Sequence, residues 1–589
     1  MSLSNMDAMD AKSPLVSPAH TRQTRQFRWK HLAWALTSSA LLYTLIPHFC
    51  VSSRPVSCQE RARVTYEGGS VFWEPCGEIT GHLLECSDVT VPMNHFGNSS
   101  DADGREQVFT IPLIRMRAKN ATENLIINPG GPGGSGVGFV YQIGDELNTI
   151  LDEGYHIMSF DPRGVNGSRP KAECYPDEAT RRAHSMPRSG PLSDTGDMYA
   201  WNKNFARACY DHMGEHAKYI NTPQTAADMD SILDAVGQED MIYWGFSYGT
   251  TLGQTYATMY PERSKRVVID GVANINDTYR RLDPDQKHLS DSDRVLYGFF
   301  DECVKAGPDR CPLAPFGSTA DDLQEAVLSR VDELRYEPLS VYVNSTVHGI
   351  FDYPNLLTNA IFYTLYAPKR SWAPVAGQLA RFMGGNATDL WMEHGRGDVY
   401  ASIGEAIRFV TFNDAKSGPE YWPQGRQDVV DEIVRVANRS LFSRIDMTGF
   451  FGRQQWIIPR THDFVPQEKV ETAHPLLILT TSYDPICPIK GAFFARDIFV
   501  GSQIIELKGY GHCSDAMPSL CVARHVKAYF DKGTVPENHT QCEVDGDYFP
   551  SRGKDDKVIE GRGLVSFNDP EMDRIHLAQS RLARKWPAW

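Results

Sequence analysis

The sequence lacks the features that mark several large classes of protein. After residue 30 it has no run of Lys and Arg, and its formal net charge is −15, so it offers no concentrated positive charge for nucleic-acid phosphates. It has no paired C-x-x-C motif of the kind that binds zinc. It also has no internal repeat and no low-complexity tract. We therefore expect no nucleic-acid partner, no metal and no other cofactor.

What remains is the composition of an ordinary folded protein. Hydrophobic residues make up 41% of the chain and charged residues 23%, close to the averages of globular proteins. At 589 residues the chain exceeds what one hydrophobic core usually organises. We therefore expect either two domains or one domain with a large insertion, and no feature indicates an oligomeric state.

One apolar segment, residues 32–46, follows a basic stretch near the N-terminus. It suits the core of a signal peptide, and the small residues at 51–53 offer a cleavage site. A single uncleaved membrane anchor is the alternative, although a spanning helix needs about 20 residues. Both alternatives predict the secretory pathway, with the protein secreted or anchored by this segment and its catalytic part outside the cytoplasm. The basic residues are Arg22, Arg25, Arg28 and Lys30.

Acceptor triplets for N-glycosylation, N-x-S/T, also indicate the secretory pathway. Eight occur, whereas about two or three are expected from composition. Several are therefore predicted to carry glycans on surface loops. Their asparagines are Asn98, Asn120, Asn166, Asn276, Asn344, Asn386, Asn438 and Asn538.

The 12 cysteines predict disulfides, because their spacing is not that of a metal site. Free buried thiols are the alternative. The close spacings predict local bridges, and two longer pairings are expected first. The local pairs are Cys76/Cys86, Cys303/Cys311 and Cys521/Cys542, and the longer ones are Cys174/Cys209 and Cys487/Cys513.

Short apolar runs alternate with helical spacing along much of the chain, which is typical of a parallel sheet with helices on both faces. The alternation stops near residue 275, where helical stretches follow, and resumes near 475. We predict an α/β protein with a mostly parallel sheet and a large, mainly helical insertion. Strands are predicted at 104–118, 124–128, 155–160, 241–246, 266–269, 475–480 and 502–507, and helices at 225–236, 248–260, 320–335, 355–365, 402–412, 488–499 and 519–531.

These patterns divide the chain into five predicted segments. Residues 1–57 are the targeting segment, 58–274 and 471–550 the two parts of the α/β core, 275–470 the helical insertion and 551–589 a polar tail. Within the tail, the amphipathic stretch from Met572 to Trp586 predicts a surface helix rather than a membrane-binding element.

The candidate nucleophile is Ser247, in the sequence Gly245-Phe246-Ser247-Tyr248-Gly249. A serine hydroxyl is a poor nucleophile and needs a nearby base and a backbone turn that exposes its oxygen. G-x-S-x-G between a predicted strand and a predicted helix indicates such a turn. We therefore predict a serine hydrolase.

A glycine-rich loop at 128–136 follows an early strand. Acyl transfer places negative charge on the former carbonyl oxygen, and backbone N–H groups must stabilise it. The loop can present the N–H of Gly131 opposite that of Tyr248, at the start of the nucleophile helix. A nucleotide phosphate loop is the rival interpretation, but no Gly-Lys-Ser/Thr follows.

The acid and base are expected after the serine, in that order. Asp484 directly follows a predicted strand and His512 follows the next one. His512 would take the proton of the serine, and Asp484 would fix the histidine tautomer. Asp270, after another strand, is an alternative acid, and His474 and His525 are weaker alternatives for the base because neither follows a strand.

Together these motifs resemble the tripeptidyl aminopeptidase-like branch of the prolyl aminopeptidase family of α/β-hydrolases, over residues from about 60 to 550. The resemblance implies a helical cap over the site and the triad Ser247, Asp484 and His512. It also implies peptide substrates with a free N-terminus, whose ammonium group cap carboxylates such as Glu405 and Asp414 would bind. The matching stretches are NPGGPGGSG at 128–136, FDPRGVNGS at 160–168, NTPQTAADMD at 221–230, WGFSYGTTLGQTYATMYPE at 244–262, TTSYDPICP at 480–488, GYGHCS at 509–514, and the later PSLCV and QCEVDG.

Three functions remain open from the sequence. The favoured one is an aminopeptidase that releases short peptides or single residues through an acyl-enzyme. An esterase or biosynthetic acyl hydrolase is the second, because the same triad activates any acyl carbonyl. A catalytically silent binding protein is the third, and it would be expected to lack a member of the triad or the loop.

Overall fold

The computed structural model describes residues 68–97, 99–100, 103–187, 192, 194–281, 289–395, 401–551 and 567–586. The predicted targeting segment and the acceptor Asn98 lie outside these residues. Among the helices described, none is both long enough and apolar enough to cross a membrane.

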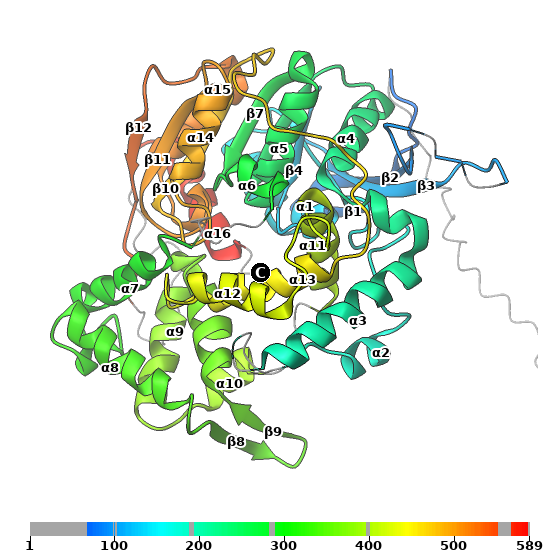
Figure 1. Ribbon diagram of the computed structural model, residues 1–589. Coiled ribbons are helices and arrows are strands. Elements are labelled where there is room, and N and C mark those ends of the chain that lie inside the picture. The colour runs from blue at the N-terminus through cyan, green and yellow to red at the C-terminus, as the bar shows by residue number, and fades with distance from the viewer. Residues whose placement is uncertain are drawn as a thin grey trace, which may run out of the picture. The chain divides into compact units, whose positions relative to one another are not determined.

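A ten-stranded sheet organises the described chain, in the order β1-β2-β3-β5-β4-β6-β7-β10-β11-β12 (Figure 1). The pairings β1-β2, β2-β3 and β3-β5 are antiparallel, and all the others are parallel. The predicted mostly parallel sheet is therefore confirmed. The strands are β1 (Glu74–Ile79), β2 (His82–Pro92), β3 (Val108–Met116), β4 (Asn124–Asn128), β5 (His156–Phe160), β6 (Met241–Phe246), β7 (Ser264–Asp270), β10 (Leu477–Tyr483), β11 (Gln503–Tyr510) and β12 (Thr540–Glu543).

Side chains of each central strand alternate between two separate cores. In β6, Tyr243 packs into the core on one face, and Trp244 packs into the core on the other. Burial on both faces explains why these strands consist of consecutive apolar residues in the sequence. Helices α4 (Thr222–Val236), α5 (Tyr248–Met259) and α14 (Lys490–Ile498) contribute to the first core, and α1 (Gly136–Ile150), α15 (Leu520–Lys532) and α16 (Pro570–Lys585) to the second.

Helix α16 lies in the segment that the sequence predicted to be a polar tail with a surface helix. Its Ile575 and Leu582 are buried in the core that α1 and α15 share. Trp586, just after the helix, is fully buried, and its ring lies 5.1 Å from that of Phe246 and 6.2 Å from that of Phe139. The amphipathic pattern was recognised, but the face that it buries completes the core of the sheet.

Between β7 and β10 the chain leaves the sheet and forms mainly helices (Figure 1). It also contains a hairpin, β8 (Leu339–Asn344) and β9 (Val347–Phe351), that the sequence did not indicate. In β8 only Val341 is buried, so the strand carries little of the apolar alternation by which strands are recognised. The helices are α6 (Ile275–Tyr279), α7 (Ser292–Ala306), α8 (Ala320–Glu333), α9 (Pro368–Met383), α10 (Thr388–His394), α11 (Ala401–Asp414), α12 (Arg426–Ala437), α13 (Arg444–Gln455) and the π-helical segment η4 (Asn355–Phe362).

An earlier segment also joins this helical region. After β5 come α2 (Glu178–Ala183) and α3 (Thr195–Met213). Met198 of α3 shares a small core with Val429 of α12 and Phe451 of α13. Two stretches far apart in the sequence therefore build the helical part of the molecule, and the sequence indicated only the second.

Four of the five expected disulfides are present. Cys76–Cys86, Cys174–Cys209, Cys303–Cys311 and Cys521–Cys542 are bridged, which fits an oxidising, extracellular compartment. The fifth prediction, Cys487/Cys513, is wrong, because both are free buried thiols. The Sγ of Cys513 instead donates to the carbonyl oxygen of Asp270, at 3.3 Å.

Candidate active site

Ser247 occupies a sharp turn between β6 and α5. Its φ and ψ are 55° and −124°, a region that non-glycine residues occupy at a cost of about 1 to 3 kcal/mol. The turn requires its flanking glycines. A Cβ on Gly245 would lie 2.4 Å from the carbonyl oxygen of Gly249, and one on Gly249 would lie 2.8 Å from that of Asn128. The predicted strand, turn and helix around Ser247 are therefore present.

His512 and Asp484 meet at the ends of β11 and β10. The Nδ1–H of His512 donates to the Asp484 carboxylate, at 2.8 Å to Oδ2 and 3.0 Å to Oδ1. Backbone N–H groups of Ile486, Cys487 and Cys513 also donate to this carboxylate, at 2.8 to 3.1 Å. Five hydrogen bonds thus orient a fully buried acid toward one histidine nitrogen.

The other ring nitrogen of His512, Nε2, is buried and has no hydrogen-bond partner in the described part of the chain. With Nδ1 donating to Asp484, Nε2 is the ring atom that can accept a proton. The structure shows no hydrogen bond between this atom and Ser247 among the described residues. Such contacts are often long without substrate and tighten when it binds.

Asp270, the alternative acid, contacts a neighbour of the histidine instead. Its carboxylate accepts hydrogen bonds from the backbone N–H and the hydroxyl of Ser514, at 2.7 and 2.6 Å. Burial raises the pKa of Asp270 to about 6. The alternative bases also lie elsewhere, since His474 stacks edge-on against Tyr529 and His525 lies beside the Cys521–Cys542 bridge.

The glycine-rich loop lies directly against the nucleophile turn. A Cβ on Gly130 would be 2.9 Å from both the Cβ of Ser247 and the backbone nitrogen of Tyr248. The Gly130 N–H donates to the side chain of Asn128, at 3.0 Å. Tyr248 begins α5, and first-turn N–H groups have no partner within their own helix. Gly131, Ser247 and Tyr248 thus line one pocket, as the predicted oxyanion hole requires.

Two of the matching motifs hold this loop and its surroundings in place. Asp161 accepts hydrogen bonds from the Ser135 hydroxyl, at 2.6 Å, and from the Asn166 amide, at 2.8 Å. The buried guanidinium of Arg163 pairs with Asp228, with a distance of 2.7 Å from Nε to Oδ2. This ion pair joins the two motifs, FDPRGVNGS and NTPQTAADMD, and gives both a structural role.

A pocket of about 620 Å³ opens beside these residues, and we call it the substrate pocket. Gly131, Ser247 and Tyr248 form part of its wall. The rest of the wall comes from segments far apart in the sequence. It includes Asn274, Asp277, Arg280, Asp414, Arg453 and Lys490.

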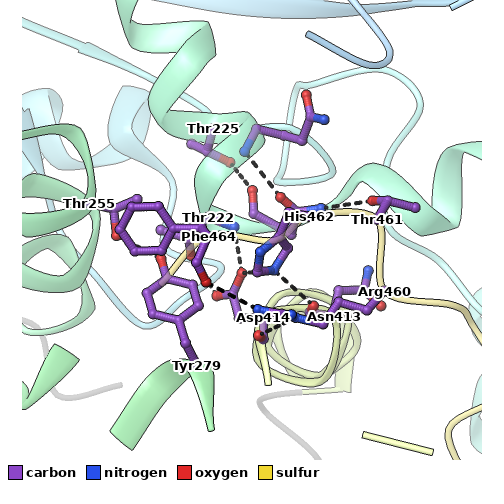
Figure 2. A network of polar contacts seen from close by, with 12 residues as sticks. Thr222, Thr225, Thr255, Tyr279, Asn413, Asp414, Arg460, Thr461, His462 and Phe464 are labelled. Atoms are coloured by element: carbon purple, nitrogen blue, oxygen red, sulfur yellow. Dashed lines mark hydrogen bonds and ion pairs between the residues drawn. The ribbon is translucent and has the colours of Figure 1, made fainter. Parts of the chain in front are cut away.

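Asp414, a predicted amine ligand, reaches this pocket from the end of α11. Its carboxylate is fully buried and accepts from the backbone N–H and the hydroxyl of Thr222, at 2.7 and 2.6 Å (Figure 2). The Thr222 hydroxyl lies 2.5 Å from that of Tyr248. Burial raises the pKa of Asp414 to about 7. Asp414 is thus linked through Thr222 to Tyr248, the residue after Ser247.

Glu405, the other predicted amine ligand, lies outside the wall of the substrate pocket. Its carboxylate pairs with Arg181, at 2.8 Å to Nε, and accepts from the backbone N–H of Cys174, at 2.8 Å. It therefore joins α11 to α2 and to the Cys174–Cys209 bridge.

A family model described as the alpha/beta hydrolase fold matches residues 123–514. The chain belongs to the α/β hydrolase fold family. The expected resemblance to tripeptidyl aminopeptidases is confirmed as well. Tripeptidyl aminopeptidase of Streptomyces lividans is 26% identical over 495 residues, which is 80% of this chain and 86% of that protein.

Two further relatives carry different names. Serine protease Hip1 of Mycobacterium tuberculosis is 27% identical over 547 residues, covering 87% of this chain and 97% of that protein. Carboxylesterase B of the same species is 28% identical over 495 residues, covering 80% and 89%. The similarity therefore extends well beyond the sheet and spans most of the length of each of these relatives.

The sequence did not single out Asp277, Arg280 or Lys490 of the pocket wall. Asp277 and Arg280 pair with each other, and Asp277 lies shortly after the end of β7. Position directly after a strand end was the signal that identified Asp484 and His512, but Asp277 lies seven residues beyond β7, within α6, so this signal did not identify it. Thr222 was missed because its role depends on Asp414, which is 192 residues away.

The same α/β hydrolase site holds one group of metal-ligand type. Asp484, Cys487 and His512 have ligand atoms within 4.8 Å of one another. Two of them already bond to each other, and burial raises the pKa of the Cys487 thiol well above its ordinary value. A metal prefers the thiolate, so this donor set fits a hydrogen-bonded acid and base better than a metal centre.

Proposed function

We propose that this protein is a serine hydrolase that removes short peptides or single residues from free N-termini, through an acyl-enzyme on Ser247. The main support is the combination of the strained turn that places Ser247 in the wall of the substrate pocket with a buried histidine, His512, that Asp484 orients and whose Nε2 has no hydrogen-bond partner in the described chain. The relatives named serine protease and tripeptidyl aminopeptidase support a peptide as the substrate.

In this proposal each group has one chemical task. The Oγ of Ser247 attacks the carbonyl carbon while Nε2 of His512 takes its proton, and Asp484 stabilises the resulting imidazolium. The N–H groups of Gly131 and Tyr248 hold the oxyanion. His512 then returns the proton to the departing amine. Water repeats the sequence on the ester bond and frees Ser247.

Recognition of the substrate ammonium group falls to the acidic side chains of the pocket wall. Asp277 is the accessible one, with 25% of its side chain exposed. Asp414 lies deeper, where it adds negative potential to the extent that it is ionised. We therefore retain Asp414 from the predicted ligands, add Asp277 and assign Glu405 a structural role.

Hydrolysis of matched substrates tests the proposal. Tripeptide p-nitroanilides with free and acetylated N-termini are compared with a short-chain p-nitrophenyl ester, using wild type and Ser247→Ala. Cleavage that depends on Ser247 and favours the free amine is expected. Equal cleavage of the acetylated peptides would refute the exopeptidase, and activity that survives Ser247→Ala would refute the mechanism.

An esterase is the second candidate, because a relative of similar identity is named Carboxylesterase B. The same triad and oxyanion loop would serve an ester. Cleavage of the ester alone in the experiment above would select this function and would leave the role of Ser247 intact.

Exposure of the acceptor asparagines supports export with glycosylation. All seven acceptors in the described residues are exposed, and four disulfides accompany them. We extend the proposal to a glycosylated protein, secreted or held at a membrane by its N-terminal segment. A mass loss after treatment with peptide N-glycosidase checks the glycans. N-terminal sequencing of the mature protein separates a cleaved signal from a retained anchor.

A further inference from the structure

A second cavity, of about 530 Å³, adjoins the substrate pocket. Asn274, Arg280 and Phe494 line both cavities, so the two share part of their walls. We call the second one the cationic pocket. Its wall includes three cations, Arg280, Lys416 and Arg460, and apolar side chains such as Phe464 and Val465.

None of the residues lining the cationic pocket is Asp or Glu. Arg460 is half-buried and donates to two backbone carbonyls, those of Asp414 at 3.2 Å and Phe464 at 3.3 Å (Figure 2). Within the described chain it forms no ion pair with a carboxylate, and neither does the exposed Lys416. Arg280 pairs with Asp277, so the cations that an entering anion meets without a carboxylate partner in the described chain are the Arg460 guanidinium and the Lys416 ammonium group.

The net charge of the walls of these two cavities is opposite in sign to the net charge of the whole chain. The whole chain carries a formal charge of −15, yet the walls of the two adjacent cavities contain five cations and only two acids. One of those acids is Asp414, which burial keeps partly protonated near neutral pH. The cations are Arg280, Lys416, Arg453, Arg460 and Lys490.

Such a local excess attracts anions even on an acidic protein, because charges lining a cleft focus the potential inside it. The apolar wall adds contact for an aliphatic stem or a neighbouring side chain. Val465 and Phe494 at this wall are 71% and 49% exposed, so they can bury apolar surface when a ligand binds.

We propose that the cationic pocket binds a carboxylate of the substrate, from an acidic side chain or from the C-terminus of a short peptide, while the scissile carbonyl lies at Ser247. This inference rests on the proposed function for the position of the scissile bond. The acidic side chain Asp277 and the cationic pocket then recognise opposite charges of one peptide, the ammonium group and a carboxylate.

Binding to Ser247→Ala tests the cationic pocket without turnover. Calorimetry compares pentapeptide amides with a free N-terminus in which one position at a time is Glu, Gln or Lys, and a neutral pentapeptide as free acid and as amide. We expect Glu to bind about two- to fivefold more tightly than Gln at one position or more, with Lys weakest there. If the neutral pentapeptide binds more tightly as free acid than as amide, the group that the pocket binds is the C-terminal carboxylate instead. Either advantage should shrink as salt rises from about 0.05 to 0.5 M.

Variants of the pocket assign the effect to its cations. In the Ser247→Ala background, Lys416→Gln should lower the advantage of the carboxylate, and Lys416→Glu should abolish or invert it. Lys203→Gln, an exposed change on α3, is the matched control and should leave it unchanged. Arg460→Gln should act like Lys416→Gln. Because Arg460 also binds two carbonyls, thermal unfolding of that variant establishes whether it is folded.

Equal binding of Glu, Gln and Lys peptides, and of acid and amide, would overturn the inference. So would an advantage of Glu that Lys416→Glu leaves unchanged. Failure of the proposed function is a different result, since in that case wild type binds the peptides with the expected preference but does not cleave them.

Discussion

The candidate active site has a sheet side and a cap side, and the two hold their residues in different ways. On the sheet side, Ser247, Asp484 and His512 each lie at or within two residues of the end of a strand, and nearby backbone groups hold them. On the cap side, Asp414 is fixed by Thr222, 192 residues away. The comparison teaches that Ser247, Asp484 and His512 are positioned by local strand ends, whereas the position of Asp414 depends on packing between distant segments.

The largest expected effect concerns the sheet side. Ser247→Ala should lower kcat/KM by more than about 10⁴-fold, because no other group can form the acyl-enzyme. Thermal unfolding should change little, since only a hydroxyl is removed. Ser231→Ala on α4 is the control and should retain full activity. Comparable activity of the two variants would show that Ser247 is not the nucleophile.

Asp484→Asn should cost about 10³- to 10⁴-fold in kcat, because the amide no longer holds His512 in the tautomer that accepts a proton at Nε2. Asp270→Asn provides the comparison. It contacts Ser514 rather than His512, so its effect on kcat should stay below about tenfold. The reverse order of the two effects would make Asp270 the acid. Steady-state kinetics on one chromogenic substrate measure both.

The difference between the two sides also explains what the sequence could predict. Ser247, Gly131, Asp484 and His512 follow short apolar runs that identify strands, and the ends of parallel strands meet at one edge of a sheet. The hydrogen bond between Asp484 and His512 was therefore predictable. Glu405 and Asp414 carried no such signal. Helical spacing located α11, but only the packing of α11 against α2 and α4 turns Glu405 toward Arg181 and Asp414 toward Thr222.

On the cap side, a substitution of Asp414 should change how stability depends on pH more than it changes the rate of catalysis. The folded-state pKa of Asp414 is raised to about 7, against about 3.9 in an unfolded chain. Between these values the folded protein holds a proton that the unfolded chain has released, so stability should fall as pH rises from about 4 to about 7. Asp414→Asn should remove this part of the dependence. Its Tm relative to wild type should therefore increase by a few degrees across that range, as measured by scanning calorimetry. A constant difference in Tm would contradict the raised pKa.

The smallest effect concerns the two free thiols of the described chain, Cys487 close after Asp484 and Cys513 next to His512. Cys487 is 7% exposed and Cys513 is fully buried, and burial raises the pKa of both thiols. Iodoacetamide should therefore label them slowly in the folded protein and quickly after denaturation without reductant. Peptide mapping measures both rates. Recovery of a peptide pair linked through Cys487 and Cys513 would contradict the free thiols and support the disulfide that the sequence predicted.

The burial of Trp586 has a consequence for the order in which the protein matures. Phe246, next to Ser247, rests on the Trp586 ring, and Arg370 of α9 donates to the Trp586 carbonyl, at 2.9 Å. The apolar underside of the nucleophile turn is therefore covered only after synthesis reaches residue 586. Until then a nascent chain would carry the complete triad on an unfinished core. Activity should thus require the chain through residue 586, well beyond His512.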